Sequence, residues 1–485
     1  MRHLLIPVIA IASIHRSFGA DLEFNFKLAS LTEHNTSASP QYDQAHFPPN
    51  FGTESQVSRT QTFEIDPSKM DLSMNAASPG HVSGADVHTL IPSRPNLRWF
   101  AHLMGWWGSG KPFDIGVDMD TDEYIAKMIA DMRRRGFDGV IVCWNSPGSR
   151  DDRIVRRIQS HLKTLPPGSF SFMVLIDQGL IDKLQTTEAQ KKRLEEAVNY
   201  CKANFFDDPN YERDGGKPML MFYGVRAFFG KVAGRAGGAA AALSEVKAAT
   251  GGDMVWADVL PSYLNEDWED QAYDWHDAHP NGPNPKDPYN FASIQHFYDS
   301  VKDSGKKVIG AMSAGYNGTL SKLDGGWAVG HYLPQDNGKC LIERARFIES
   351  ILPVNVTHMQ WVTWNDWAEG TSAEPGIENN IAVDASIEGS TLKWSVSGGS
   401  GDESTINHYD IYASPDGENA ALLASVPTGK GAFDLASVAG LKADPPYDIV
   451  VVAVGKPCIR NHAAPPVKYG AAHSRQNESQ PHADQ

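Results

Sequence analysis

The chain has 485 residues, a length that accommodates two or three domains of about 100–200 residues each. Acidic residues outnumber basic residues by 59 to 43, and the net charge of −16 argues against nucleic acid and anionic membranes as partners. With 41% hydrophobic and 21% charged residues, the chain can bury a large core. The 12 Trp and 15 Tyr residues provide flat rings that can stack on sugars.

The first 20 residues resemble a secretory signal, because Arg2 and His3 precede an apolar run and Gly19 and Ala20 follow it. We therefore predict that residues 1–20 are removed and that the protein is secreted or extracytoplasmic. The alternative is an unprocessed strand or helix. No other apolar run approaches the roughly 20 residues of a membrane span. Residues 21–95 are polar and rich in Pro, and we expect a loosely structured segment.

The four cysteines are Cys143, Cys201, Cys340 and Cys458. They are widely spaced and form no CxxC motif, so the sequence supports neither a disulfide framework nor a zinc or redox site. We expect no metal and no organic cofactor.

From Leu97 onward, short apolar runs alternate with amphipathic segments, as in buried parallel strands joined by crossover helices. The predicted strands are residues 97–105, 139–144, 171–177, 218–223, 253–259, 307–313 and 357–364. The predicted helices are residues 121–135, 152–165, 188–203, 239–249, 291–304 and 340–352. A (β/α)8 barrel needs one more strand, which we expect around residues 272–276. We predict a barrel over residues 96–383, with an open doubly wound sheet as the alternative.

The pattern changes after about Asp384. The predicted strands there are short and alternating, and they comprise residues 392–396, 408–413, 421–426 and 447–454. Gly, Asp and Pro turns separate them, and no helical period occurs. We predict a small β-sandwich of fibronectin or immunoglobulin type over residues 384–462, as an accessory domain. The polar tail, residues 463–485, is predicted to be disordered.

The segment that bears most directly on function reads Gln-Trp-Val-Thr-Trp-Asn-Asp-Trp-Ala-Glu-Gly-Thr-Ser-Ala-Glu-Pro, from Gln360 to Pro375. The last predicted barrel strand runs directly into Asp366 and Glu369. Active sites of barrels lie at this end of the strands, and carboxylate pairs framed by tryptophan can act as acid and base on glycosidic bonds. The other interpretation is a capped, exposed acidic turn, and the spacing alone does not decide between the two.

The run Trp-Asn-Asp-Trp-Ala-Glu-Gly-Thr, with Glu374 behind it, resembles the closing signature of two glycoside hydrolase families. They are family 99, the endo-α-mannosidases and α-mannanases, and family 71, the fungal α-1,3-glucanases. Residues 313–319, 100–104 and 137–145 also resemble segments of these families, in the expected order. The resemblance implies a (β/α)8 barrel and matches Asp366 and Glu369 to the two catalytic carboxylates. It implies that Glu369 is the general acid and Asp366 the base or assistant.

Other residues at predicted strand ends are candidates for substrate binding by position. They are His102, Trp106, Trp107, Trp144, Asn145, Asp177, Asp258, Tyr316 and Asn317, together with Trp364 and Asn365 of the closing segment. Each of them can equally be a structural residue. The glycine-rich loop that contains Trp106 and Trp107 mimics a phosphate-binding loop, but Pro112 stands where such a loop needs Ser or Thr for magnesium.

The sequence therefore predicts a glycoside hydrolase that cleaves an α-linked polysaccharide, with α-1,3-glucan favoured and α-mannan as the alternative. A non-catalytic carbohydrate-binding barrel is a second hypothesis. A serine esterase is a third, since residues 311–315 resemble a nucleophile elbow around Ser313.

Overall fold

The computed structural model describes residues 26–27, 82–106, 118–227, 229, 236–259, 264–275, 278–279, 284–318, 330–399 and 402–470. The chain forms two compact units. The barrel unit contains the described residues from 82 to 379 and Pro457–Arg460. The β unit contains residues 26–27, 380–456 and 461–470. The predicted signal, residues 1–20, and Trp107 lie outside the described residues.

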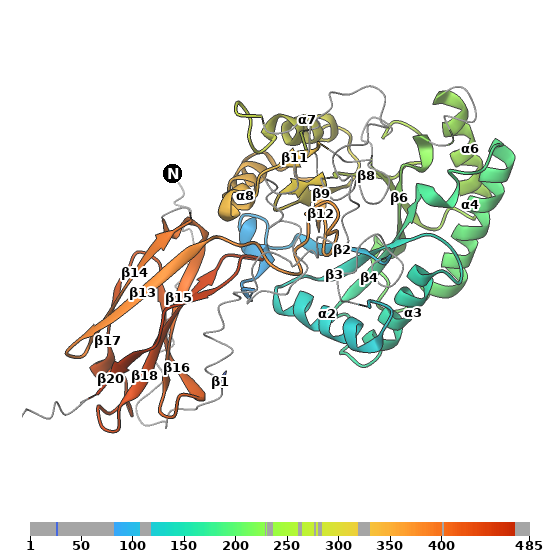
Figure 1. The fold of residues 1–485 in the computed structure, drawn as a ribbon. Coiled ribbons are helices and arrows are strands. Elements are labelled where there is room, and N and C mark those ends of the chain that lie inside the picture. Colours follow the sequence, from blue (N-terminus) through green and yellow to red (C-terminus); the bar gives the residue numbers. More distant parts are fainter. Residues whose placement is uncertain are drawn as a thin grey trace, which may run out of the picture. The chain divides into compact units, whose positions relative to one another are not determined.

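Eight parallel strands form a closed ring in the barrel unit (Figure 1). They are β2 (Arg98–Met104), β3 (Gly139–Trp144), β4 (Ser171–Asp177), β6 (Lys217–Tyr223), β7 (Val255–Asp258), β8 (Gln271–Tyr273), β9 (Val308–Met312) and β12 (Val356–Trp361). Their order is β4-β3-β2-β12-β9-β8-β7-β6, and the β4–β6 pairing closes the ring. The short strand β5 (Arg213–Asp214) pairs antiparallel with β6. The predicted barrel is confirmed, and closure rules out the open sheet.

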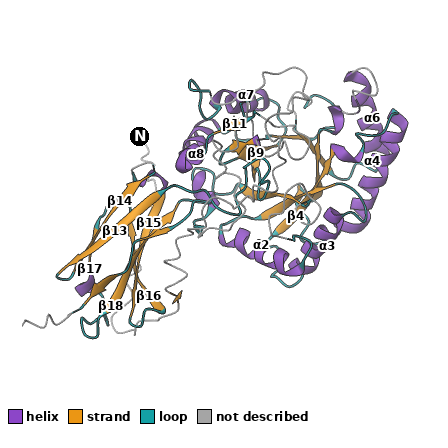
Figure 2. Cartoon of the chain, in the orientation of Figure 1, coloured by secondary structure: helices purple, strands orange, loops and turns teal. Residues whose placement is uncertain are grey.

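Helices surround the ring of strands (Figure 2). They are α2 (Asp122–Arg134), α3 (Arg150–Leu162), α4 (Thr187–Cys201), α6 (Ala236–Ala249), α7 (Phe291–Val301) and α8 (Lys339–Ile351). The side chains of Thr121, Ser149 and Thr186 cap α2, α3 and α4 by accepting a backbone N–H. The apolar stripe of α2, at the spacing of a single helix face, packs on the strands. It consists of Ile125, Met128, Ile129 and Met132.

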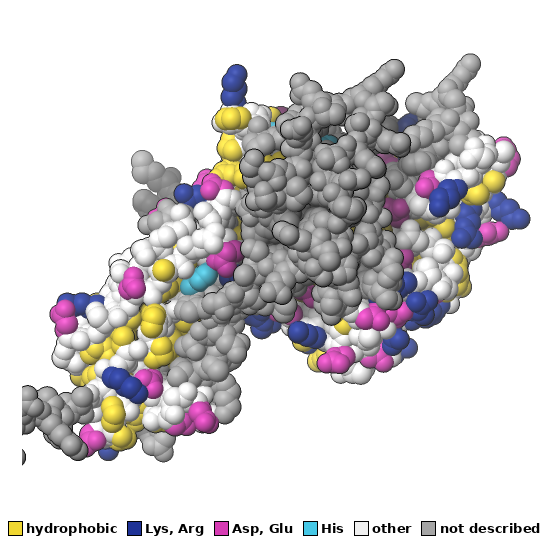
Figure 3. All heavy atoms as spheres, viewed as in Figure 1, with side chains coloured by type: hydrophobic (Ala, Val, Ile, Leu, Met, Phe, Trp, Pro, Cys, Tyr) yellow, Lys and Arg dark blue, Asp and Glu magenta, His cyan; other side chains and the backbone are white. Residues whose placement is uncertain are grey.

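The outer faces of α2 and α3 carry charges of both signs, which are interspersed in Figure 3. Asp120 forms ion pairs with Arg153 (2.7 Å) and Arg157 (2.9 Å), and Arg157 also reaches Asp122 (2.6 Å). Exposed pairs of this kind contribute little to stability individually. On this face, therefore, the excess of acidic residues forms no single-signed patch.

The eighth strand is β8, which lies between β7 and β9 and overlaps residues 272–276, where it was predicted. It is only three residues long, and polar Gln271 opens it, so no apolar run marks it in the sequence. The Tyr273 hydroxyl donates to the Phe222 carbonyl at 2.7 Å and ties β8 to β6. In the described part of the β7–β8 connection, Trp268 packs on Trp256 with ring centroids 6.5 Å apart. This tryptophan pair covers the outside of β7.

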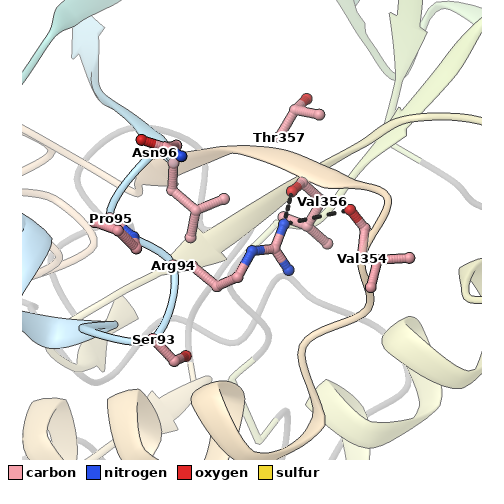
Figure 4. A pocket seen from close by; sticks show the side chains of 8 residues that line it. Ser93, Arg94, Pro95, Asn96, Val354, Val356 and Thr357 are labelled. Carbon is pink, nitrogen blue, oxygen red and sulfur yellow. Dashed lines mark hydrogen bonds between the residues drawn. The ribbon is translucent and has the colours of Figure 1, made fainter. Parts of the chain in front are cut away.

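A pocket lies at the N-terminal ends of β2 and β12 (Figure 4). It is lined by Ser93, Arg94, Pro95, Asn96, Leu97, Val354, Val356 and Thr357. The Arg94 guanidinium spans it and donates to the carbonyls of Pro353 (3.0 Å), Val354 (3.3 Å) and Val356 (2.7 Å). Active sites of this fold occupy the opposite end of the strands. We therefore assign Arg94 to joining the barrel's first and last strands.

The β unit consists of two antiparallel sheets (Figure 1). One contains β13 (Ile381–Glu388), β14 (Thr391–Gly398) and β17 (Ala432–Asp434). The other contains β1 (Phe26–Lys27), β15 (Ile406–Ser414), β16 (Asn419–Pro427), β18 (Tyr447–Gly455), β19 (His462–Ala463) and β20 (Val467–Tyr469). The predicted C-terminal β domain is confirmed. Trp394 is buried in its core and packs on Tyr409 with ring centroids 5.4 Å apart.

The limits of the β unit differ from the segments assigned by sequence. Strand β13 begins at Ile381, before the predicted change at Asp384, because Ile381 and Val383 alternate with exposed residues and face the core. At the other end, Ala463 of β19 and the whole of β20 lie within the segment predicted as a disordered tail. Tyr469 is buried in the core there. The polarity of the flanking residues concealed this last strand.

His88, in the segment before β2, joins two acidic side chains. Its Nε2 lies 3.3 Å from Asp138 and its Nδ1 lies 2.7 Å from Asp86. The hydrogen bond to Asp138 is the main reason that the pKa of His88 rises from 6.5 to about 9, and Asp86 adds to the rise. Burial of the imidazole acts in the opposite direction. Because the pKa is raised in the folded state, this stabilisation is complete below pH 6.5 and is lost as the pH rises through about 9.

We expect the free energy of unfolding of the wild type to exceed that of His88→Gln at about pH 6, and the difference to shrink by about pH 10. Urea unfolding of both proteins at the two pH values measures it. Comparing variant with wild type cancels the titration of other groups. An equal difference at both pH values would contradict the assignment.

Candidate active site

The closing segment turns back into the barrel after β12 through a group of buried hydrogen bonds around Thr363. The Thr363 hydroxyl accepts the backbone N–H of Asp366 at 2.7 Å and lies 2.9 Å from the Thr371 hydroxyl. The Thr363 N–H donates to the Thr371 carbonyl at 3.2 Å. Both threonines are fully buried. These bonds determine the direction in which the chain presents Asp366.

Asp366 and Glu369 are held together by the same turn. An Asp366 carboxylate oxygen accepts the backbone N–H of Glu369 at 3.2 Å, and Thr371 N–H donates to the Asp366 carbonyl at 3.2 Å. Asp366 is 3% exposed and Glu369 9% exposed. An exposed acidic turn would leave both side chains in water, so their burial disagrees with that interpretation.

Tyr316 and Asn317 form the short strand β10 (Tyr316–Asn317), which pairs with β11 (Tyr332–Leu333). Both residues of β10 are hydrogen-bonded to Glu369. The Asn317 N–H donates to the Glu369 carbonyl at 2.7 Å. The Tyr316 side chain is hydrogen-bonded to Glu369. Burial, followed by the Glu369 charge and this hydrogen bond, raises the pKa of Tyr316 far above its usual range. The tyrosine therefore stays protonated and acts as a donor to the carboxylate.

A second acidic group lies at the ends of β3 and β4. The amide of Asn145 donates to Asp151 at 2.6 Å, and the Gly179 N–H donates to Asp177 at 2.8 Å. Burial raises the pKa of Asp177, and the charges of Asp182 and Asp151 add to this. Burial is the main cause of the raised pKa of the Cys143 thiol, and the charges of Asp177, Asp151 and Asp366 add to it. The structure thus brings Asp177 and Asn145 to the mouth that contains Asp366.

His102 faces the barrel interior, next to a cluster of aromatic side chains. Its ring meets Trp275 edge-on, with centroids 4.9 Å apart. Trp275 in turn lies 5.0 Å from Tyr223, the last residue of β6. Burial lowers the pKa of His102 to about 3, so the imidazole is neutral. His102 therefore acts as a packing partner of Trp275 and carries no charge into the site.

Two other candidates at strand ends point out of the barrel. Trp144 donates its indole N–H to Asp152 of α3 at 3.2 Å and stacks on Tyr200 of α4 with centroids 5.8 Å apart. Asp258 shares the outward face of β7 with Trp256, by the two-residue alternation of a strand. Burial raises the pKa of Asp258 to about 7. Both side chains pack between strands and the outer layer, away from the acid pair.

Two candidates in the closing segment hold it in place. Asn365 is fully buried, and its side chain accepts the Met104 N–H at 2.8 Å and donates to the Met104 carbonyl at 3.1 Å. Trp364 lies 4.9 Å under the guanidinium of Arg135, which donates to the Ala373 carbonyl at 2.6 Å. Trp106 is partly buried against the barrel core. The contacts of Asn365 and Trp364 tie the closing segment to Met104 and Arg135.

Sequence reasoning missed several residues of the mouth. Tyr223 ends a predicted strand, which is the criterion that selected Asp177, and could have been found. Thr363 is a small polar residue inside an apolar run, which also marks it. Asp151 lies beyond a strand end, at the start of α3. Trp275 follows the strand that no apolar run marks. Glu374, the last acid of the closing segment, points toward α2 instead, where it accepts a hydrogen bond from the Tyr124 hydroxyl at 3.2 Å.

The esterase hypothesis loses its structural basis. Ser313 follows β9 and is fully buried, but the short strand β10 comes next, whereas a nucleophile elbow leads into a helix.

In the part of the chain that the structure describes, no three His, Cys, Asp or Glu side chains gather as a metal site. No helix within the same residues is both long and apolar enough to span a membrane.

Comparison with known proteins finds no matching family model and no matching curated protein. Among solved structures, an endo-α-mannosidase of glycoside hydrolase family 99 from Bacteroides thetaiotaomicron is 16% identical, covers 57% of this chain and 86% of its own, and has a TM-score of 0.43. A family 5 glycoside hydrolase from Bacteroides vulgatus is 9% identical, with coverages of 71% and 87% and a TM-score of 0.33. A family 27 β-L-arabinopyranosidase from Geobacillus stearothermophilus is 9% identical, with coverages of 84% and 99% and a TM-score of 0.32. At these values the similarity does not assign an activity.

Proposed function

We propose that the protein is a glycoside hydrolase that cleaves an α-linked polysaccharide with Asp366 and Glu369. The observation that carries the proposal is the burial of both carboxylates at the carboxyl end of the barrel strands, in a turn held by buried hydrogen bonds. A pair of acids in a water-poor site suits proton transfer to a glycosidic oxygen. The resemblance of the closing segment to two glycosidase families supports the same chemistry.

In the proposed reaction, Glu369 donates a proton to the leaving glycosidic oxygen. One of its oxygens can carry that proton while the other accepts the hydrogen bond from Tyr316. Asp366 removes a proton from the attacking group, which is water or the substrate's own 2-hydroxyl. Thr363 and the Glu369 N–H hold Asp366 in one orientation. Preorganisation of this kind lowers the barrier because little is left to align during reaction.

The proposed substrate is α-1,3-glucan, with α-mannan as the alternative. Asp366 follows the glucanase pattern and is one methylene shorter than the glutamate of the mannosidase pattern. Gly370, Thr371 and Glu374 follow the mannosidase pattern. We further propose that the protein acts outside the cytoplasm, on the basis of the signal-like first 20 residues.

The test is the release of reducing ends from α-1,3-glucan, α-1,4-glucan and α-mannan, each incubated with the full chain. We expect release from one polymer, which would name the sugar. Binding of a polymer without release of reducing ends would contradict the proposal and favour a non-catalytic carbohydrate-binding barrel.

A further inference from the structure

Two aromatic side chains that the proposed reaction does not use meet at the carboxyl end of the barrel. Tyr223 ends β6, and Trp275 follows β8. Their ring centroids are 5.0 Å apart and their planes are inclined by 50°. Both are only partly buried against the barrel core. Each residue therefore keeps some surface that the protein does not cover.

Neighbouring rings hold Trp275 in one orientation. The His102 ring meets it edge-on at 4.9 Å and 88°, and the Tyr273 ring at 6.3 Å and 66°. Tyr273 is itself anchored, because its hydroxyl donates to the Phe222 carbonyl. Edge-to-face contacts of this kind stabilise an aromatic cluster beyond simple burial. Trp275 is thus a rigid surface, which loses little conformational entropy when a ligand stacks on it.

Tyr223 also borders the acid pair, Asp366 and Glu369. After burial, the charge of Glu369 is the largest cause of the raised pKa of Tyr223, followed by Asp177, Cys143 and Asp366. The Cys143 thiol stays neutral, because its pKa is raised well above its usual value, so the negative charge comes from the carboxylates. A ligand in contact with Tyr223 therefore experiences a negative potential, which repels anionic groups. Sugar hydroxyls, in contrast, can donate hydrogen bonds to these carboxylates.

We propose that Trp275 and Tyr223 form a stacking platform for the sugar ring beside the scissile bond, and that this platform takes an uncharged pyranose and excludes uronic acids. The inference rests on the proposed function, since it uses Asp366 and Glu369 to locate the bond that is cleaved. It adds a binding site and a substrate class to the acid pair. His102 is a positioning residue for Trp275.

The experiment is calorimetric titration of the full chain carrying Asp366→Asn and Glu369→Gln, so that the ligand is not hydrolysed. The neutral probes for this variant are a tetrasaccharide of α-1,3-glucan and a tetrasaccharide of α-mannan. The charged probe, a tetragalacturonate, is titrated into the wild type, which keeps the negative charges of both carboxylates. We expect one neutral tetrasaccharide to bind and the tetragalacturonate not to bind. Adding Trp275→Leu should weaken binding by about 10- to 100-fold, and Trp275→Phe by less than about 5-fold.

Tyr447→Leu, at a partly buried aromatic residue of the β unit, is the matched control, and melting temperatures verify folding. Affinity of the Trp275→Leu variant within about 2-fold of its parent would overturn the platform, as would equal loss in Trp275→Phe. Tight binding of the tetragalacturonate would overturn the charge assignment. Failure of the wild type to cleave any polymer, with this binding pattern intact, would overturn the proposed function alone. No binding by any probe would overturn both.

Discussion

Asp366→Asn and Glu369→Gln are each expected to lower kcat on the cleaved polymer by about 10²- to 10⁴-fold, the usual contribution of general acid–base catalysis. Both substitutions keep the size and the hydrogen-bonding shape of the side chain. The amide oxygen introduced by Asp366→Asn can still accept the Glu369 N–H, which Asp366 accepts at 3.2 Å, so the turn should persist. KM and the melting temperature should therefore stay close to the wild-type values.

The matched control is Glu196→Gln, an exposed glutamate of α4 that loosely faces Arg193 at 3.9 Å. It removes one negative charge from the barrel surface and should leave kcat unchanged. Reducing-end assays under saturating polymer measure all three variants. If either site variant retains more than about a tenth of wild-type kcat, its carboxylate is not the acid or base of the reaction.

Thr363→Val is expected to lower kcat by about 10- to 100-fold with a smaller effect on KM. Valine has the shape of threonine but cannot accept the Asp366 N–H, which the Thr363 hydroxyl binds at 2.7 Å. An unpaired buried donor costs about 1–3 kcal/mol. The loop can relieve this cost by moving, and a displacement of about 1 Å at a catalytic group can cost about 10²-fold in rate.

Thr363→Ser separates this explanation from simple loss of packing. Serine keeps the hydroxyl and loses only the methyl group, so its kcat should be close to that of the wild type. Thr250→Val, at a buried threonine whose hydroxyl donates to Val246 at 2.9 Å, should change stability without changing kcat. If Thr363→Ser is as impaired as Thr363→Val, the methyl group matters and the hydrogen bond does not position Asp366.

The prediction of strands succeeded where strands are buried on both faces. Such strands appear in the sequence as continuous apolar runs, and the predicted boundaries of β3 and β4 agree with the structure to the residue. The short strand β8 has no such run, so only its approximate place could be predicted. β20 was assigned to a tail because its few apolar residues become meaningful only beside β18.

A continuous apolar run also hides which way each side chain points. The sequence placed Trp144, Asp177 and Asp258 alike at strand ends, but the structure turns Asp177 toward Tyr223 and Cys143. It turns Trp144 toward α3 and α4. Alternation has a period of two, so a shift of one residue exchanges inside for outside. When both faces are apolar, composition does not reveal the phase.

Local patterns of apolar and acidic residues are enough to predict the barrel class, the antiparallel β domain and the segment that carries Asp366 and Glu369. The burial of both acids, the contacts of Thr363 with one of them and of Tyr316 with the other, and the adjacent pair of Tyr223 and Trp275 become visible only in the folded chain. Those contacts join β6, β8, β10 and the loop after β12, which are far apart in the chain. Their closeness follows from closure of the barrel, which brings the carboxyl ends of all its strands to one mouth.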